Sequence, residues 1–332
     1  MEFGPVPVAE AEGAILAHSL VLTVGKLGKG HVLDAADVAA LVAHGCDRVT
    51  VARLGPEDIG EDFAALSVAQ ALVPDALAAG LELTVPHAGR VNLRAARVGL
   101  IGMNRAVLDA LNMADSAITL ATLPPLARVA AGDLVGTVKI ITYGVQRAAL
   151  ARALIGVAGA IRVMPVVLRR AGLILTEVPG PELKLIAKGR RVVAARLAGL
   201  GIDLVDVRVV AHDGRAISEA LGSIGGDIVL MLTGAATSDP YDVAPSALRA
   251  AGGVVLRFGM PVDPGNLLFH GYLGARRVVG LPGCARSPAL NGADWVLERL
   301  ACGLEVTDTD IAAMGVGGLL KEIPQRGRLR EG

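Results

Sequence analysis

The second half of the chain alternates short apolar runs with amphipathic stretches. Five runs have the length and the aliphatic composition of buried strands: 171–178, 204–211, 227–234, 252–259 and 276–283. The stretches between them carry apolar residues at helical spacing and predict helices over 184–200, 217–223, 243–251 and 294–302. Apolar strands that alternate with helices are typical of an α/β domain with a largely parallel sheet covered on both faces. We predict such a domain over residues 166–332.

The first half of the chain follows a less regular pattern. Residues 25–54 predict a turn, a short helix that begins after Asp34 and a strand with alternating polarity. A second helix is predicted over 61–73, and residues 81–142 alternate short strand-like runs with turn signals. Residues 1–165 are therefore predicted to form a mixed α+β region.

Three loops follow predicted strands of the second half and are rich in small and polar residues. They are the first loop (233–242, TGAATSDPYD), the second loop (259–271, GMPVDPGNLLFHG) and the third loop (280–292, GLPGCARSPALNG). Parallel connections bring the carboxyl ends of strands to one edge of a sheet, where ligands of open α/β sheets bind. We therefore expect the function of the protein to lie in these loops.

The first loop has the composition of a phosphate site. Its small side chains let backbone N–H groups approach a ligand, its hydroxyls supply donors, and the helix that follows favours an anion at its N-terminus. Asp242 either caps that helix or accepts a hydrogen bond from a ligand, and both interpretations stay open. In the other loops, the turns at 264–266 and 282–283 expose the backbone, and Arg286 and Ser287 offer donors to an oxyanion.

Charge and composition narrow the classes of partner. The 32 Lys and Arg residues balance 32 Asp and Glu residues, so no overall field attracts polyanions or membranes, and local geometry must hold any anion. Aromatic residues make up only 2% of the chain, which leaves almost no platform for base stacking. We therefore predict neither a nucleic-acid partner nor a membrane partner.

The mean hydropathy of +0.55 raises the question of a membrane span. The longest stretch without an acidic or basic residue is 13–25, which is shorter than the roughly twenty residues of a spanning helix. The first twelve residues lack a basic segment of the secretory type, so we expect a cytoplasmic protein. Its three cysteines show no C-x-x-C spacing, which argues against a disulfide framework and a structural zinc site.

The three loops resemble those of the molybdopterin-binding domain shared by molybdopterin adenylyltransferases and molybdopterin molybdotransferases. That domain has a TGGTG-like or SGGVS-like loop with an Asp a few residues later, then PGN and GLPGNP-like loops. The corresponding strings here are TGAATSDPYD, DPGNLL and GLPGCARSP. The similarity covers about 171–304 and is greatest to the part that in some bacteria precedes a cytidylyltransferase domain for the molybdenum cofactor. It implies a three-layer α/β/α domain with a largely parallel sheet.

The resemblance also implies a set of site residues. Asp213 and Asp242 stand at the family's acidic positions and are the candidate catalytic residues. Molybdopterin or the molybdenum cofactor is the implied ligand. The implied ligand-binding residues are Thr176, Thr233, Gly234, Ala235, Ala236, Thr237, Ser238, Asp239, Pro264, Gly265, Asn266, Pro282, Gly283, Cys284, Arg286 and Ser287. The sequence assigns no metal ligands; if a transfer reaction needs Mg²⁺, the candidates are Asp213, Asp239 and Asp242.

The chain departs from the family's pattern at three places. Ala235 and Ala236 stand where the family has Gly or a small polar residue, which disfavours positive φ angles and predicts a reshaped phosphate cradle. No counterpart of the MDGYA-like segment of molybdotransferases is found, which argues against molybdate insertion. Cys284 replaces the Asn of GLPGNP, either as a contact to a metal or a dithiolene sulfur or as an inert small residue.

We therefore predict a cytoplasmic molybdopterin-binding protein that acts in the biosynthesis or handover of the molybdenum cofactor. One alternative is a transferase of the same pathway, either a molybdopterin adenylyltransferase or a molybdotransferase. Another is a non-catalytic interaction scaffold. The expected partners are molybdopterin, a cofactor nucleotidyltransferase or a molybdoenzyme, and further copies of the chain in a homo-oligomer. The nucleotide and the acceptor enzyme stay open.

Overall fold

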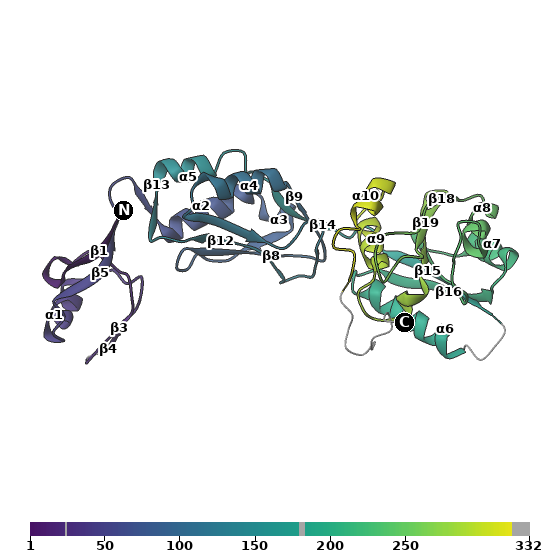
Figure 1. The fold of residues 1–332 in the computed structure, drawn as a ribbon, viewed down its shortest axis with the longest axis horizontal. Coiled ribbons are helices and arrows are strands. Elements are labelled where there is room, and N and C mark those ends of the chain that lie inside the picture. Colours follow the sequence, from purple (N-terminus) through teal and green to yellow (C-terminus); the bar gives the residue numbers. More distant parts are fainter. Residues whose placement is uncertain (24, 179–182, 321–332) are drawn as a thin grey trace. The chain divides into compact units, whose positions relative to one another are not determined.

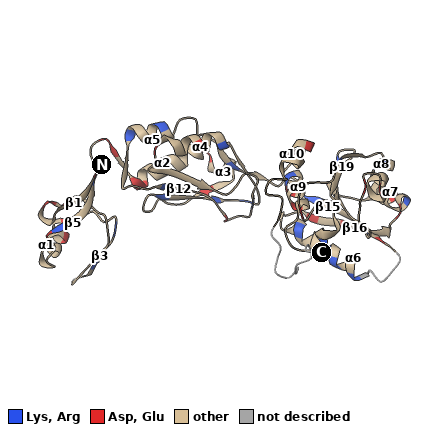
Figure 2. Ribbon diagram, in the orientation of Figure 1, with Lys and Arg blue, Asp and Glu red and all other residues tan. Residues whose placement is uncertain are grey.

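The computed structural model describes residues 1–23, 25–178 and 183–320 (Figure 1). Contacts divide the chain into two compact units. Unit 1 comprises Met1–Arg97 with Ile101–Met164, and unit 2 comprises Val98–Leu100 with Pro165–Gly332. Acidic and basic residues are interspersed along both units, as the balanced charge implies (Figure 2).

The N-terminal part of unit 1 holds two small antiparallel sheets and one helix. Strands β1, β5 and β2 form the first sheet in this order, and β3 pairs with β4. Helix α1 begins after Asp34, as predicted, because the Asp34 side chain accepts a hydrogen bond from the backbone N–H of Asp37. The elements are β1 (Glu2–Pro7), β2 (Ile15–Leu16), β3 (Leu20–Leu22), β4 (Gly25–Leu27), α1 (Ala35–Ala43) and β5 (Arg48–Arg53).

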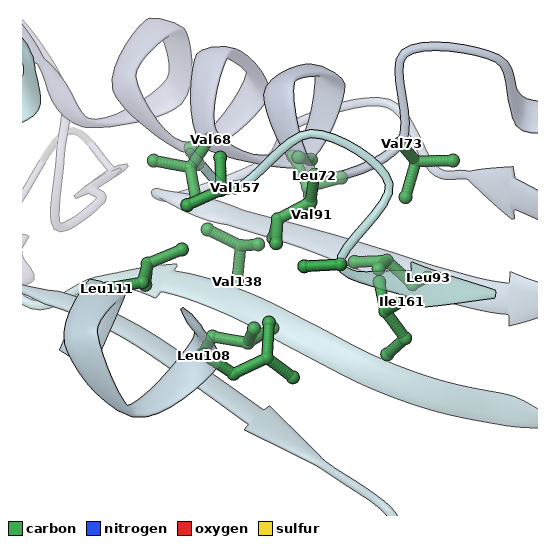
Figure 3. Close-up of a cluster of buried hydrophobic side chains, with 14 of the residues drawn as sticks. Val68, Leu72, Val73, Val91, Leu93, Leu108, Leu111, Val138, Val157 and Ile161 are labelled. Atoms are coloured by element: carbon green, nitrogen blue, oxygen red, sulfur yellow. The ribbon is translucent and has the colours of Figure 1, made fainter. Parts of the chain in front are cut away.

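The remainder of unit 1 packs helices against a four-stranded sheet of order β10-β12-β8-β7. The predicted second helix is α2 (Glu61–Leu72), and its Val68 and Leu72 are buried with Val91 and Val138 (Figure 3). The other helices are α3 (Ala76–Ala79), α4 (Arg105–Ala114) and α5 (Arg147–Ala153). The strands that lie wholly or mostly in unit 1 are β6 (Asp58–Gly60), β7 (Leu81–Leu83), β8 (Arg90–Ala95), β9 (Gly99–Met103), β10 (Ile118–Thr122), β11 (Arg128–Val129), β12 (Leu134–Ile140), β13 (Gly144–Gln146) and β14 (Ile161–Pro165).

Unit 2 is built on a six-stranded sheet of order β16-β15-β17-β20-β19-β18. Its strands are β15 (Arg170–Glu177), β16 (Asp203–Ala211), β17 (Ile228–Leu232), β18 (Val254–Phe258), β19 (Phe269–Leu273) and β20 (Arg276–Leu281). Its helices are α6 (Leu183–Ala198), α7 (Gly214–Ser223), α8 (Val243–Ala250), α9 (Gly292–Ala301) and α10 (Asp308–Ala313). All five predicted strands and all four predicted helices of this half are present, with shifted ends.

The sheet is mixed, which corrects the expectation of a largely parallel sheet. Strands β16, β15, β17 and β20 pair in parallel, whereas β19 pairs antiparallel with both β18 and β20. Residues 269–271 fall within the predicted second loop, because a short run that contains His270 lacks the apolar pattern of a buried strand, but the structure has Phe269–Leu273 as β19. Pairing on both sides makes it a strand.

Helices α7 and α8 pack on one face of this sheet. Their Ile217, Leu221 and Leu248 share a buried cluster with Ile174 and Met231 of the central strands. Helices α6 and α9 also contact the sheet, through β15 and β20 respectively. Within the part of the chain that the structure describes, no helix is long and apolar enough to cross a membrane.

His270, the second residue of β19, is buried and titratable. Its exposed fraction is 2%, and its Nε2 atom has no hydrogen-bond partner among the described residues. Burial lowers the pKa of His270 below its usual 6.5, with Asp308 opposing the shift and Arg257 adding to it. The folded protein therefore resists protonation of this ring.

We predict that the free energy of unfolding of unit 2 falls as the pH is lowered from 7 toward 5. Below pH 6.5 the unfolded chain binds a proton at His270 that the folded chain does not bind, so acid favours unfolding with a slope of at most about 1.4 kcal/mol per pH unit. Urea unfolding followed by the fluorescence of Trp295, the single tryptophan, measures this. The His270→Leu variant is expected to lose the slope, and a variant at the exposed His44 is expected to keep it. Parallel profiles for wild type and His270→Leu contradict the prediction.

Candidate functional site

A cavity with two lobes lies where β17 and β20 lead into the first and third loops. The PGN lobe has a volume of about 330 Å³. It is lined by Ala236, Asp263, Pro264, Gly265, Asn266, Leu267, Pro282, Gly283 and Cys284. The α6 lobe has a volume of about 460 Å³. It is lined by Leu185, Lys188, Gly234, Ala235, Ala236, Gly283, Cys284, Arg286 and Ser287. The lobes share Ala236, Gly283 and Cys284, so they adjoin, and each has a size typical of small-molecule sites.

The start of the first loop is in close contact with the C-terminal end of β15. The backbone N–H of Gly234 donates a hydrogen bond of 2.8 Å to Oγ1 of Thr176, which also pairs with Nδ1 of His212 at 2.8 Å. A Cβ atom at Gly234 would lie 2.8 Å from the carbonyl oxygen of Thr176, closer than Cβ atoms approach. Glycine is therefore needed here for close contact between the loop and the strand.

The two alanines of the first loop fit its conformation. Neither Ala235 nor Ala236 has a positive φ angle, so the loop does not require glycine at these positions. Both methyl groups are exposed and line the α6 lobe. This agrees with the expectation that alanine disfavours positive φ angles at these positions, and the two alanines give the cavity a small apolar wall.

Two buried threonines hold the first loop from inside. The Thr233 hydroxyl donates to the carbonyl of Ala235 at 2.7 Å and lies 3.4 Å from the hydroxyl of Thr237. Both side chains are less than 8% exposed, and neither lines a lobe. Their hydroxyls stabilise the loop and do not face the cavity.

Asp242 stabilises the C-terminal end of the first loop through two hydrogen bonds. Its Oδ2 accepts from the N–H of Ser238 at 2.9 Å, and its Oδ1 accepts from Val243 at the start of α8 at 2.7 Å. These hydrogen bonds from Ser238 and Val243, together with nearby His212, hold the pKa of the Asp242 carboxyl below its usual value. Asp242 is therefore a negatively charged helix cap, which is one of the two interpretations left open above.

The other two predicted aspartates also accept hydrogen bonds from backbone N–H groups close to them in the chain. Asp213 caps α7 by accepting from the N–H of Ala216 at 2.9 Å, and Asp239 accepts from the N–H of Tyr241 at 2.7 Å. Within the described ranges no three His, Cys, Asp or Glu side chains gather as metal ligands. The structure thus does not bring Asp213, Asp239 and Asp242 together as a Mg²⁺ site.

The second and third loops touch through their backbones. The N–H of Gly292 donates to the carbonyl of Pro264 at 2.8 Å. Gly265 has a φ of +148°, and a Cβ atom there would lie 2.9 Å from Cα of Gly292. A residue with a side chain would be strained by both the conformation and the contact. Glycine at 265 therefore keeps the two loops together on one side of the PGN lobe.

Arg196 of α6 holds the third loop in place. Its Nε is 2.5 Å from Oδ1 of Asp294 on α9, and both side chains are nearly buried. Its two terminal nitrogens donate to the carbonyls of Ala285, Ser287 and Ala289 at 2.7 to 3.1 Å. One guanidinium thus satisfies three backbone acceptors and one carboxylate, which joins α6, α9 and the loop.

Arg286 connects the third loop to the neighbouring first loop, whereas Cys284 makes a contact within the third loop itself. Nη2 of Arg286 donates to the carbonyl of Thr233 at 2.6 Å, which links the third loop to the end of β17. Nδ2 of the fully buried Asn291 lies 3.1 Å from Sγ of Cys284. The Cys284 side chain is therefore held where the two lobes meet.

The structure separates the predicted site residues into two groups. Eleven of them line the lobes: Gly234, Ala235, Ala236, Pro264, Gly265, Asn266, Pro282, Gly283, Cys284, Arg286 and Ser287. Seven do not: Thr176, Asp213, Thr233, Thr237, Ser238, Asp239 and Asp242. The first group forms the wall, and most of the second group makes hydrogen bonds that hold the first loop.

Sequence reasoning missed residues on α6. Lys188 and Leu185 line the α6 lobe, whereas Arg190 and Arg191, two further basic residues of the same helix, do not. Helix α6 carries five basic and no acidic residues. The spacing of Leu185 and Lys188 by three positions puts them on one helix face and is the signal that was available.

A larger hollow of about 900 Å³ lies in unit 1. Several of its charged groups are already engaged: Lys139 lies 3.5 Å from Glu61 and donates to the carbonyl of Ala88, and Asp62 accepts from the N–H of Gly89 at 2.6 Å. The three candidate loops do not contribute to it. Volume by itself therefore does not make it the candidate site.

The fold is an α/β domain whose candidate site is a cavity lined by loops at one sheet edge. Residues 186–301, which include all three loops, match the family described as a probable molybdopterin binding domain. The resemblance of the loops to this family is thereby confirmed. Residues 5–53 match a domain of unknown function, DUF8806. Among curated proteins no match was found.

Solved structures of molybdenum cofactor proteins share low overall similarity with this chain. The molybdopterin biosynthesis moeA protein from Pyrococcus horikosii is 15% identical, with 91% of this chain and 76% of that chain covered and a TM-score of 0.32. A molybdenum cofactor biosynthesis protein B is 16% identical, with 40% and 86% covered and a TM-score of 0.27. A molybdenum cofactor biosynthesis protein from Pyrococcus furiosus is 12% identical, with 94% and 65% covered and a TM-score of 0.23.

We predict that the Arg196→Met variant destabilises unit 2 by about 3–5 kcal/mol, because it leaves the nearly buried Asp294 without its counter-charge. Urea unfolding followed by Trp295 fluorescence measures the loss. Adding Asp294→Asn is expected to restore part of it. The control Arg215→Met breaks an exposed pair with Glu219 and is expected to cost less than about 1 kcal/mol. Equal losses in the two single variants contradict the role of Arg196.

Proposed function

We propose that this protein binds molybdopterin, or the molybdenum cofactor, in the two-lobed cavity and acts in the biosynthesis or handover of that cofactor. The observation that carries the proposal is that eleven residues implied by the family's loops line one cavity, within a segment that matches a probable molybdopterin binding domain. The proposal extends to the three-layer α/β/α arrangement of the family, with α7 and α8 on one face and α6 and α9 on the other.

The α6 lobe offers the features that a phosphate group needs. Its wall at 234–236 and 283 consists of glycines and alanines, which allow an anion to approach the backbone. Lys188 supplies a cation at the rim, and Arg286 adds a second cation, whose Nη2 also bonds the carbonyl of Thr233. We place the phosphate of the pterin in this lobe.

The PGN lobe offers a place for the rest of the ligand. It is lined by backbone at 264–266 and by Asn266, whose amide can donate to and accept from a polar ring. Cys284 lies at the junction of the lobes, between the proposed phosphate and the ring. Asp242 and Asp213 keep supporting roles in this proposal, since their carboxylates cap helices.

We predict that the wild-type chain binds molybdopterin and that Lys188→Met weakens binding about tenfold, since a hydrogen bond to a charged group contributes about 1.5–3 kcal/mol. Anaerobic isothermal titration calorimetry measures the affinity. Ala236→Asp is expected to weaken binding further, because its carboxylate enters both lobes and repels a phosphate. Arg191→Met, on the same helix but outside both lobes, is the matched control and is expected to bind like the wild type.

A folded wild-type chain that binds neither molybdopterin nor nucleotide contradicts the proposal and supports the scaffold alternative. Equal weakening by Lys188→Met and Arg191→Met contradicts the placement of the phosphate, because only Lys188 lines the lobe.

Transfer chemistry is the second candidate function, and the presence of two adjoining lobes favours it. For this candidate the occupants differ from those above: the α6 lobe holds the pterin phosphate, and the PGN lobe holds a nucleotide phosphate or molybdate in place of the pterin ring. The test is incubation with molybdopterin, Mg²⁺ and either ATP or CTP, with and without molybdate, followed by assays for pyrophosphate and for loaded cofactor. Product formation supports a transferase, and binding without turnover supports handover.

A further inference from the structure

The strand β16 forms one edge of the six-stranded sheet in unit 2. It pairs with β15 on one side, and no described strand pairs with it on the other. It is nine residues long with the sequence DLVDVRVVA, and Val205 and Val209 are 42% and 47% exposed. The register of β16 against β15 shifts between Leu204 and Asp206, so Val205 is the extra residue of an irregularity and the regular part of the edge runs from Asp206 to Ala211. An edge strand presents a row of unpaired backbone groups that another strand can pair with.

The direction of the backbone groups along β16 follows from one hydrogen bond. The N–H of His212, just after the strand, donates to the carbonyl of Glu177 on β15 at 2.9 Å. Because successive residues of a strand face opposite sides, Val210, Arg208 and Asp206 turn their backbone groups toward β15. The backbone groups of Val207 and Val209 therefore face the open edge.

The sequence of β16 is complementary to itself when read in the opposite direction. In an antiparallel pair of two β16 strands centred on Val207, each Asp206 stands opposite the Arg208 of the other strand, within the regular part of the strand that begins at Asp206. Centring the pair on Asp206 or Arg208 would put like charges face to face. Opposite charges directly across an antiparallel pair stabilise it, and like charges destabilise it.

The contacts of these charged groups suit this pairing. Arg208 and Asp206 already form an ion pair of 3.1 Å within one chain, and Arg208 also donates to the hydroxyl and the carbonyl of Ser223. In the dimer, the Asp206 of each copy would face the Arg208 of the other copy, so each of these four charged groups would have an opposite charge across the interface. Val207 lies on the axis, where its outward N–H and carbonyl can pair with those of the second copy.

We propose that two copies of this chain associate through β16, antiparallel and centred on Val207, so that their two sheets become one continuous sheet. A two-fold axis perpendicular to the sheet requires an antiparallel pair, which the self-complementary strand provides. Antiparallel pairing also places the loops and the cavity of one copy at the opposite end of the joined sheet from those of the other copy. The interface therefore leaves both cavities open and does not depend on the ligand that they bind.

The test is the mass of the full chain in sedimentation velocity over a range of concentrations. Wild type is expected to be a dimer. Val207→Lys and Val207→Asp are each expected to raise the dimer dissociation constant on the order of 100-fold, because like charges then meet on the axis. An equimolar mixture of the two variants is expected to restore the dimer, because the introduced lysine of one copy then faces the introduced aspartate of the other. Val254→Lys, at an exposed valine of the opposite edge strand β18, is the matched control and is expected to stay dimeric.

A second variant covers the case in which a charge at 207 prevents folding, which circular dichroism and Trp295 fluorescence report. Val209→Pro removes only an outward N–H, which an edge strand tolerates, and is expected to give a folded monomer. A monomeric wild type overturns the proposal, as does a dimer that persists in the folded Val207 and Val209 variants. A dimer lost in Val254→Lys but kept in those variants overturns it as well.

Discussion

The third loop of unit 2 depends on one nearly buried guanidinium. Three carbonyls of this loop, at residues 285, 287 and 289, accept hydrogen bonds from Arg196, which also pairs with Asp294. Buried carbonyls need donors, and no other side chain offers five N–H groups in one plane. Because Arg196 lies on α6 and Asp294 on α9, the same residue sets where α6 runs. Lys188, two turns earlier on α6, reaches the cavity as a consequence.

The cavity itself is made mainly of backbone and small side chains. Gly234 allows the first loop to lie against Thr176, and Gly265 allows the second loop to lie against Gly292. In both places a Cβ atom would come within 3 Å of another backbone. These two close contacts between loops and neighbouring backbone therefore require glycine at positions 234 and 265. A neutral chain can hold an anion in such a site, because backbone N–H groups supply the donors and only a few cations are needed.

Local patterns made the strands, helices and loops of unit 2 predictable. An apolar run such as the one in β17, or a turn such as 282–283, is encoded by neighbouring residues. Strand β19 was missed because it depends on its partners: Phe269–Leu273 becomes a strand by pairing with β18 and β20 on either side. The same dependence explains the mixed sheet, since only β19 runs against the others.

Three features of the candidate site could be read from the chain alone: the three loops after apolar strands, the small residues where backbones must approach, and the resemblance to molybdopterin-binding domains. The position and the hydrogen-bond partners of each side chain became clear only from the folded structure. It turned Asp242 and Asp213 into helix caps, put Thr233 behind the cavity wall, and brought Lys188 to the rim. The physical reason is that periodicity and turn chemistry act between near neighbours. The direction of a side chain and the partner of a buried charge depend instead on residues far away along the chain.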